Sequence, residues 1–305
     1  MYNALLYLIT VFIWGSTWLA IKFQLGVISP ELSIAYRFGL AAIILIVFSL
    51  LRRLPMGFSL KTHAFFALQG LLLFSLNYFL VYLAEGNLTS GLVAIIFSLI
   101  IVLNVLFGAI FLGNPVRLRM MIGAGLGLLG LAFVFWPELT SLSLSSQKIV
   151  GMIMAFIATI SASLGNVVSA RNQRNDLPVI QTNAYGMLYG AVFMLVTALI
   201  RGAALEFDTS PGYVLSLFYL AIFGSVIAFG SYLTLLGRIG LDRAAYVTVL
   251  FPVIALLLST IFEDLRWGIY QLLGVLLILL GNAAGVTKKG GFSFRKKVTG
   301  DAVLK

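Results

Sequence analysis

Cysteine is absent from this sequence, and charged residues are few. Without cysteine there are no disulfide bonds, no thiolate catalysis and no cysteine metal sites. Charged residues make up 10% of the 305 residues, against roughly 25% in an average soluble domain. Apolar residues reach 61%, which is more than a soluble globule of this size can cover with polar surface. Much of the chain is therefore expected to lie in lipid.

Side chains for catalysis are also missing from the apolar runs. The one histidine, His63, falls near the end of an expected helix, and no acidic residue falls in the middle of one. A serine protease needs a base beside its nucleophile, a paired-aspartate protease needs two carboxylates, and metal hydrolysis needs a cluster of ligands. We therefore expect no enzyme, no cofactor and no metal site. The lack of a central carboxylate also favours a uniporter or exchanger over a carboxylate-based proton antiporter.

The net charge of +10 does not indicate a nucleic-acid partner. The basic residues lie in short gaps between apolar runs and in the tail after residue 287. They form no stripe of the kind that tracks phosphates. Membrane topology and lipid headgroups explain them better. The expected partners are a lipid bilayer and a small-molecule substrate, with no nucleic acid.

Apolar runs of about 20 residues, the length that crosses a bilayer, recur along the whole chain. The first starts almost at Met1 without a basic leader, so we expect a first helix rather than a cleaved signal peptide. The sequence predicts an all-α integral membrane protein with ten transmembrane helices. The expected spans are 3–22, 32–51, 63–84, 89–112, 118–136, 149–170, 179–200, 213–237, 243–262 and 267–287.

Lysine and arginine orient these spans. With both termini in the cytoplasm, fifteen of the twenty basic residues fall on the cytoplasmic side, four fall outside, and Arg37 falls within a span. This is the positive-inside pattern, and an odd number of spans would disrupt it. We therefore predict a multi-pass protein of a bacterial inner (plasma) membrane with both termini cytoplasmic.

The ten spans divide into two halves of five. Residues 138–147 (ELTSLSLSSQ) are the clearest polar break. Gly123 and Gly130 lie seven residues apart, as do Gly274 and Gly281, and the two pairs are offset by 151. Because five is odd, the halves are expected to be inverted repeats around a central cavity, an architecture common in transporters. The predicted units are the five-helix repeats 1–137 and 148–287, followed by a basic cytoplasmic tail, 288–305.

Small residues four apart mark the fifth and tenth spans, as Gly123/Gly127 and Gly281/Gly285. Such pairs let helix backbones approach closely in lipid. They predict packing within the scaffold or association into a homodimer, rather than a role in substrate binding.

Several motifs together resemble one family. The first expected helix contains WGSTWLAIK at 14–22, the second contains AYRFGLAA at 35–42, and the fifth and tenth are rich in glycine. In this order and spacing they resemble the EamA-type transporters of the drug/metabolite transporter superfamily, over nearly the whole chain except the basic tail. The resemblance implies a ten-helix carrier with a cavity between its halves. Many family members resemble exporters of amino acids or other small metabolites, and nucleotide-sugar and triose-phosphate carriers are more distant relatives.

The family pattern also places a proline within the fourth and ninth helices and a glutamate after each. Pro252 matches in the ninth helix as the implied hinge, and Glu263 and Asp264 follow it. The fourth helix departs from the pattern, with Ile101 at the offset-matched position and Asn114 where the acid is expected. For the first half, the resemblance therefore implies neither a proline hinge nor an acidic helix end.

Arg37 falls about two turns inside the second expected helix. An ionisable group at such a position is costly and usually faces the protein interior or water. Without a carboxylate near it in the span, it favours an anionic substrate group such as a carboxylate, through paired hydrogen bonds. The alternative is a structural role, in which Arg37 bonds backbone carbonyls or extends to the membrane surface. The sequence leaves both open.

Further polar and aromatic side chains fall within the spans. For any one of them, hydrogen bonding between helices is the commoner explanation. Spread over several helices, however, they predict an amphipathic cavity. The expected substrate-binding residues are Trp14, Arg37, Asn77, Tyr78, Tyr82, Asn104, Asn166, Tyr185, Tyr189, Tyr232 and Tyr246.

The sequence thus predicts a transporter of small organic metabolites, and in particular an exporter of amino acids or related compounds that works by alternating access. A nucleotide-sugar or organic-acid exchanger is the alternative, as is a membrane receptor or channel that does not transport. A channel is expected to show a repeated pore loop or a ring of charges, and neither is evident in the sequence.

Overall fold

All the regular secondary structure is helical in the residues that the computed structural model describes, which are 1–24, 26, 28–88, 90–140, 145–262 and 268–286. In this part, six helical stretches are long and apolar enough to cross a membrane, and three shorter apolar helices accompany them. Large apolar side chains such as Ile43, Val47, Leu276 and Leu280 are exposed on the outside of the helices, a surface suited to lipid rather than water. The predicted all-α class is confirmed for the described residues, and the count of ten crossings stays a prediction.

The helices follow one another along the chain with short connections. The part before residue 141 contains α1 (Tyr2–Lys22), α2 (Pro30–Leu51), α3 (Leu60–Gln69), η1 (Gly70–Leu76), α4 (Asn77–Glu85), α5 (Ser90–Ser98), α6 (Ile100–Leu112), α7 (Leu118–Val134) and α8 (Trp136–Thr140). The part after residue 144 contains α9 (Ser146–Arg174), α10 (Val179–Ile200), α11 (Pro211–Tyr219), η2 (Leu220–Ile227), α12 (Ala228–Ile239), α13 (Leu241–Ala244), α14 (Val247–Phe262) and α15 (Ile269–Val286).

Two of the expected spans change pitch in their middle. The span 63–84 is built from α3, η1 and α4, and the span 213–237 from α11, η2 and α12, where η1 and η2 are π-helices. A π-helix bonds i to i+5 and is often found at functional sites. Hydropathy gives no sign of it, because the same apolar residues form either kind of turn. The spans 89–112 and 243–262 also divide, into α5 and α6 and into α13 and α14.

The last helices of the two halves, α7 and α15, pack through glycines. A Cβ atom added at Gly130 would lie 2.6 Å from Gly274 O, and one added at Gly123 would lie 2.8 Å from Gly281 O. These distances leave no room for a side chain, so the two backbones touch. The glycine pairs therefore pack within the scaffold, one of the two expected uses, and a homodimer stays a prediction. We call this contact the glycine seam, formed by Gly123, Gly127, Gly130, Gly274, Gly281 and Gly285.

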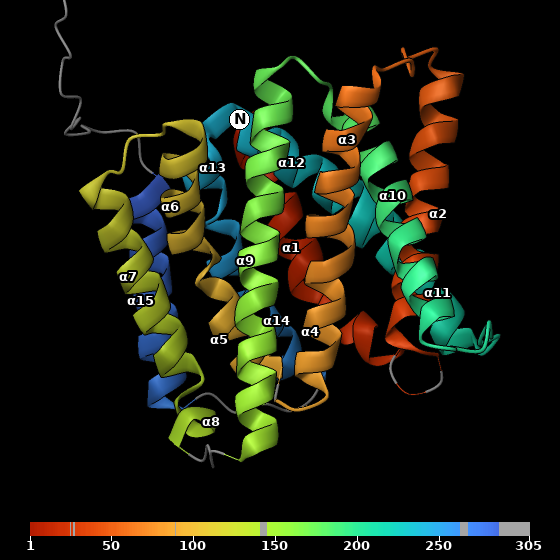
Figure 1. The fold of residues 1–305 in the computed structure, drawn as a ribbon. Helices are drawn as coiled ribbons and strands as arrows, with labels where there is room; N and C mark the ends of the chain where they lie inside the picture. Colours follow the sequence, from red (N-terminus) through yellow and green to blue (C-terminus); the bar gives the residue numbers. More distant parts are fainter. Residues whose placement is uncertain (25, 27, 89, 141–144, 263–267, 287–305) are drawn as a thin grey trace, which may run out of the picture.

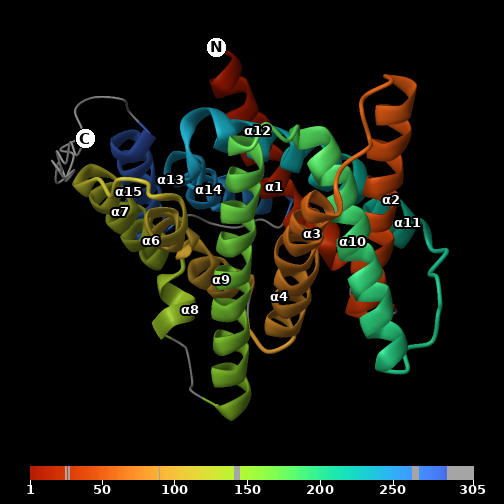
Figure 2. The ribbon, with the colours of Figure 1, turned by 45° about the horizontal axis from the view of Figure 1, so that its top comes forward.

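The helices are arranged in a row with a helix pair at each edge. Figures 1 and 2 show α7 and α15 side by side at one edge and α2 and α10 at the other, with α1, α4, α9, α12 and α14 between them. At the α2–α10 edge, Glu31 is buried and pairs with Arg201, with 2.8 Å between Oε1 and Nε. The central helices enclose the cavity described below.

Several helices of the part before residue 141 run opposite to helices of the part after residue 144. In Figure 1, α1 runs from the upper end of the molecule to the lower, and α9 runs from the lower end to the upper. The same reversal relates α2 to α10 and α7 to α15. The amino terminus and the last described turn of α15 lie at the same end.

Candidate functional site

A cavity of about 100 Å³ lies among the central helices, large enough for several water molecules. Its wall comes from both halves of the chain, with residues of α1, α2, η1, α4, α5 and α6 from the first half and α9, α12 and α14 from the second. The residues that line it are Trp14, Thr17, Ile21, Arg37, Leu73, Asn77, Tyr78, Val81, Tyr82, Phe97, Ile100, Ala162, Asn166, Phe229, Tyr232, Thr248 and Phe251.

Arg37 supplies the positive charge of this wall. Its side chain is 1% exposed, and its guanidinium carbon lies 4.8 Å from the centre of the Tyr78 ring. Its Nε donates to Ser225 Oγ at 3.0 Å. The described lining residues include no carboxylate, so the charge is not neutralised at the cavity. The sequence left a substrate-binding role and a structural role open for Arg37. Its burial rules out a surface-directed side chain, and its bond to Ser225 is compatible with either role.

The π-helix η2 positions two of these side chains. Ser225 Oγ donates to Leu220 O, five residues back, at 2.9 Å, and the same hydroxyl accepts the bond from Arg37. Gly224 O, in the same π-helix, accepts a bond from Trp14 Nε1 at 3.3 Å. The π-helix thus presents a backbone oxygen to α1 and a hydroxyl oxygen to α2.

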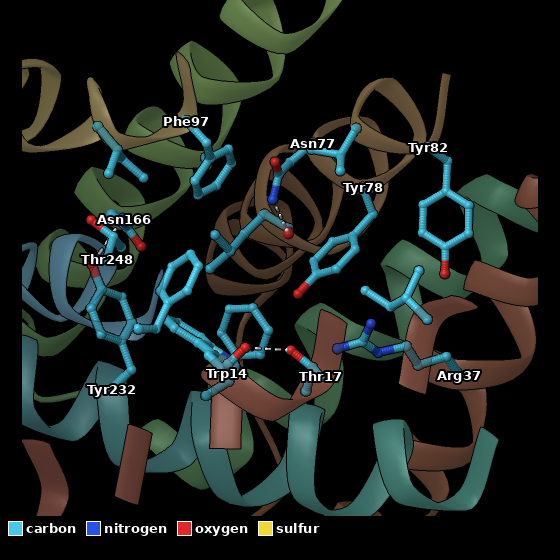
Figure 3. Close-up of a pocket in the computed structure, with 17 residues that line it drawn as sticks. Trp14, Thr17, Arg37, Asn77, Tyr78, Tyr82, Phe97, Asn166, Tyr232 and Thr248 are labelled. Carbon is cyan, nitrogen blue, oxygen red and sulfur yellow. Dashed lines mark hydrogen bonds between the residues drawn. The ribbon is translucent and has the colours of Figure 1, made fainter. Parts of the chain in front are cut away.

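The opposite side of the cavity carries amide and hydroxyl groups. Figure 3 shows Arg37 and Tyr82 on one side, Asn166, Tyr232 and Thr248 on the other, and Trp14 between them. Asn166 Nδ2 donates to Tyr232 Oη at 3.2 Å. The Trp14 ring lies 5.0 Å from that of Tyr232. The cavity is therefore cationic at one end, aromatic in the middle and neutral polar at the other end.

Several polar atoms of this wall lack a partner within the described residues. They are Arg37 Nη1, Asn77 Oδ1, Tyr82 Oη and Asn166 Oδ1, all buried. Leaving such an atom unbonded costs about 1–3 kcal/mol, so an unbonded group in a native structure indicates water or a ligand. One strong donor and two amide acceptors are therefore available to a bound molecule.

Seven of the eleven expected binding residues lie on this one cavity, and four do not. Each of the four makes a hydrogen bond outside the lining, although Asn104 Nδ2 is buried without a partner within the described residues. Asn104 Oδ1 accepts from Ser163 Oγ at 2.7 Å, and Tyr246 donates to Met120 O at 2.6 Å beside the glycine seam. Tyr185 donates to Met56 O at 2.8 Å, and Tyr189 bonds His63 Nδ1 at 3.0 Å. For these four, bonding between segments, the commoner explanation, is the one the structure gives.

Sequence reasoning missed other lining residues. Thr17 lies one turn after Trp14 within the WGST motif, so its place on the same face was available from helical spacing. Thr248 lies two residues after Tyr246, which puts the two on different faces of a helix, but the spacing does not tell which of them faces the cavity. Phe97, Phe229 and Phe251 carry no such indication, because a phenylalanine at the cavity and one in the core look alike in sequence.

The cavity wall carries groups that can bind a small molecule. No group of three or more histidine, aspartate or glutamate side chains gathers anywhere in the part of the chain that the structure describes. What the cavity offers is a guanidinium, amide oxygens, hydroxyls and aromatic rings.

Comparison with known proteins decides the family. The sequence model of the EamA-like transporter family matches residues 1–136 and 149–284. The chain belongs to this family. The EamA-like protein is 32% identical over 252 residues to the uncharacterized inner membrane transporter YedA of Escherichia coli (strain K12), an alignment that covers 81% of this chain and 78% of that protein. The resemblance seen in the WGSTWLAIK and AYRFGLAA motifs is thereby confirmed.

Two further relatives bear on function. The chain is 26% identical to the uncharacterized transporter YoaV of Bacillus subtilis (strain 168), over 88% of this chain and 91% of that protein. It is 24% identical to a protein of Escherichia coli (strain K12) named as a probable amino-acid metabolite efflux pump, over 97% of each chain. The EamA-like protein is thus a member of a family of membrane transporters.

A solved crystal structure shares the fold. It superimposes with a TM-score of 0.78 at 19% identity, over 92% of this chain and 95% of that one. At this identity the likeness concerns the arrangement of the helices alone.

Proposed function

We propose that this EamA-like protein exports small amino acids or closely related carboxylated compounds, binding them in the central cavity. The unpartnered polar atoms of the wall carry the proposal. A carboxylate would accept hydrogen bonds from the Arg37 guanidinium, whose Nη1 has no partner in the described structure. The ammonium group of the same molecule would donate to the amide oxygens of Asn77 and Asn166, which are also unbonded there.

The aromatic middle of the cavity fits the same substrate. Trp14 and Phe229 pack edge to face, 5.0 Å apart, and present apolar surface to a side chain and ring faces to an ammonium group. The cavity of about 100 Å³ favours a small solute over a nucleotide sugar. The relative named as an amino-acid metabolite efflux pump supports the same class.

The proposed mechanism is alternating access between two inverted five-helix repeats, 1–137 and 148–287. The family model matches two successive segments, the corresponding helices run in opposite directions, and both halves carry a π-helix in the same place. Pro252 lies inside α14, where its ring removes the bond to the carbonyl of Thr248, four residues back. We propose that α14 hinges there, beside the cavity-lining residues Thr248 and Phe251.

The proposed setting is a bacterial inner membrane with both termini cytoplasmic. The shared end of the amino terminus and α15 supports it, as does the excess of basic residues on that side. The tail 288–305 and the acidic residues Glu263 and Asp264 lie outside the described residues.

Counterflow in liposomes tests the proposal. Purified protein is reconstituted with an unlabelled amino acid inside, and uptake of the labelled amino acid is followed across a panel. A carrier gives saturable uptake that the internal substrate accelerates. Arg37→Gln removes the charge. It is expected to raise the substrate concentration for half-maximal uptake about tenfold or more, the effect of losing a charge-assisted bond. Arg52→Gln, an exposed arginine at the far end of the same helix, serves as the matched control.

Three results would contradict the proposal. Equal counterflow by Arg37→Gln, with a melting temperature close to that of the unaltered protein, would remove this residue from binding. Acceleration by organic acids without amino groups, and none by amino acids, would favour the organic-acid exchanger. Flux without acceleration by internal substrate would favour a channel.

A further inference from the structure

A second pocket, of about 480 Å³, shares no lining residue with the central cavity. It lies between the α6–α7 connection, the carboxyl end of α9 and the α12–α13 junction, at the end of the molecule where the amino terminus lies (Figure 1). Four arginines line it, and Asp242 is the one acid among its lining residues. We call it the arginine pocket, and its arginines are Arg117, Arg174, Arg238 and Arg243.

Two of the four arginines hold the walls together. Arg174 donates from Nη1 to Leu112 O at 2.6 Å and from Nη2 to Asn114 Oδ1 at 2.5 Å, which ties the end of α9 to the α6–α7 connection. Arg238 donates from Nε to Asn3 Oδ1 at 2.7 Å and so ties α12 to α1. These bonds occupy some of the donors of both side chains.

The other two arginines leave their charge available. Arg243 Nε is buried and has no hydrogen-bond partner within the described residues, although a donor of this kind is normally bonded when water is excluded. Arg117 is half-buried at the start of α7. Asp242 Oδ1 accepts the backbone N–H of Arg243 at 3.0 Å, so the one carboxylate of the pocket is engaged with backbone there. The pocket thus combines room, an excess of positive charge and a buried unbonded donor.

The backbone explains why these arginines face one space. Gly240 ends α12 with φ of 98°, a conformation that favours glycine. The resulting turn starts α13 at once, so Arg238 and Arg243 lie on either side of the junction and line the same pocket.

We propose that the arginine pocket binds a phosphate group. Guanidinium groups form paired, charge-assisted bonds with phosphate oxygens, and several arginines around one space match the tetrahedral set of phosphate oxygens better than a planar carboxylate. The phosphate group belongs either to a soluble anion or to the headgroup of an anionic lipid, since basic pockets between helices take headgroups as well. This site is separate from the proposed substrate cavity, and the inference does not rest on the transport proposal.

Titration of the purified full chain in an uncharged maltoside detergent tests the site. One arm uses inorganic pyrophosphate and the other a short-chain phosphatidylglycerol, with binding followed by calorimetry and by the melting temperature. We expect saturable binding in at least one arm. Arg117→Gln combined with Arg243→Gln is expected to weaken it at least about tenfold, as charge-assisted bonds are lost. Arg52→Gln combined with Arg53→Gln removes the same charge from the end of α2 and is expected to change it less than about twofold, the small effect of distant exposed charges.

Each outcome decides something. Saturable pyrophosphate binding assigns the site to a soluble anion, and saturation by phosphatidylglycerol alone assigns it to a lipid headgroup. Absence of saturation in both arms overturns the proposal, and so does an equal loss in the two double variants, which would indicate general attraction to a basic protein. If the Arg117/Arg243 double variant fails to fold, Arg117→Gln alone decides, with at least about a threefold weakening expected; unchanged binding overturns the proposal.

Discussion

The glycine seam and the central cavity are opposite solutions to helix packing within one chain. At the seam, glycine backbones of α7 and α15 touch, and an added Cβ at Gly130 would meet Gly274 O at 2.6 Å. At the cavity, large aromatic and polar side chains keep the helices apart and enclose about 100 Å³. The seam leaves no space between its two helices, whereas the side chains of the cavity wall keep a space open.

The difference teaches which part of the protein is scaffold and which part is free to bind. Close backbone contact gains dispersion energy that lipid cannot replace. The cavity instead keeps buried polar atoms such as Arg37 Nη1 and Asn166 Oδ1 without partners, at a cost in stability that a ligand can offset. Adding volume is therefore expected to damage the seam, and removing polar atoms is expected to damage binding.

Gly130→Leu is expected to have the largest effect. The new side chain meets the backbone of α15, so the two helices must separate. The expected loss of stability is at the upper end of the roughly 1–3 kcal/mol that overpacking costs, or larger. The measurement is the yield of monodisperse protein in size-exclusion chromatography and its melting temperature. Gly125→Leu on the same helix is the control, because a Cβ at Gly125 has nothing within 4 Å. Equal behaviour of the two variants would show that the seam does not hold the scaffold.

Asn77→Ala is expected to have an intermediate effect that falls on binding alone. Within the described residues, Asn77 Nδ2 bonds Leu73 O, four residues back, at 3.4 Å and makes no other hydrogen bond, so its loss disturbs packing little. The concentration of an amino acid that gives half-maximal uptake is expected to rise about tenfold, because the bond to the ammonium group is lost. The half-saturating concentration of the corresponding acid without the amino group is expected to change less than twofold. Counterflow with both compounds makes the measurement, and equal weakening for both would contradict the assignment of Asn77 to the ammonium group.

Glu31→Gln is expected to have the smallest effect, because its ion pair belongs to neither region. The Glu31 side chain is 5% exposed but that of Arg201 is 57% exposed, so solvent screens the pair. The expected loss of stability is under about 1 kcal/mol, with counterflow unchanged. A double-mutant cycle with Arg201→Gln, followed by melting temperature, measures the coupling. A loss of stability as large as that of Gly130→Leu would mean that this ion pair stabilises the helix arrangement as much as the glycine seam does.

Much of the fold was predictable because membrane insertion depends on local properties. Apolar runs, basic gaps and the glycine offset of 151 are visible in the chain itself, and the described helices follow the expected spans closely. The exceptions include the π-helices η1 and η2, whose bonding pattern depends on what neighbouring helices offer, and the divided spans 89–112 and 243–262. The site was predictable where burial of a polar group is costly, as for Arg37. It was not predictable for Tyr185 or Tyr246, since hydropathy does not tell a hydroxyl bonded to a carbonyl from one facing a cavity.

The sequence by itself determined that this protein is helical, apolar and a member of a transporter family, because those properties are written in composition, periodicity and motif. Only the tertiary structure decided which side chains share the central cavity and which arginines share a pocket at one end. The physical reason is that these groups come from helices far apart along the chain. Their distances, and the atoms left without partners, are set by packing.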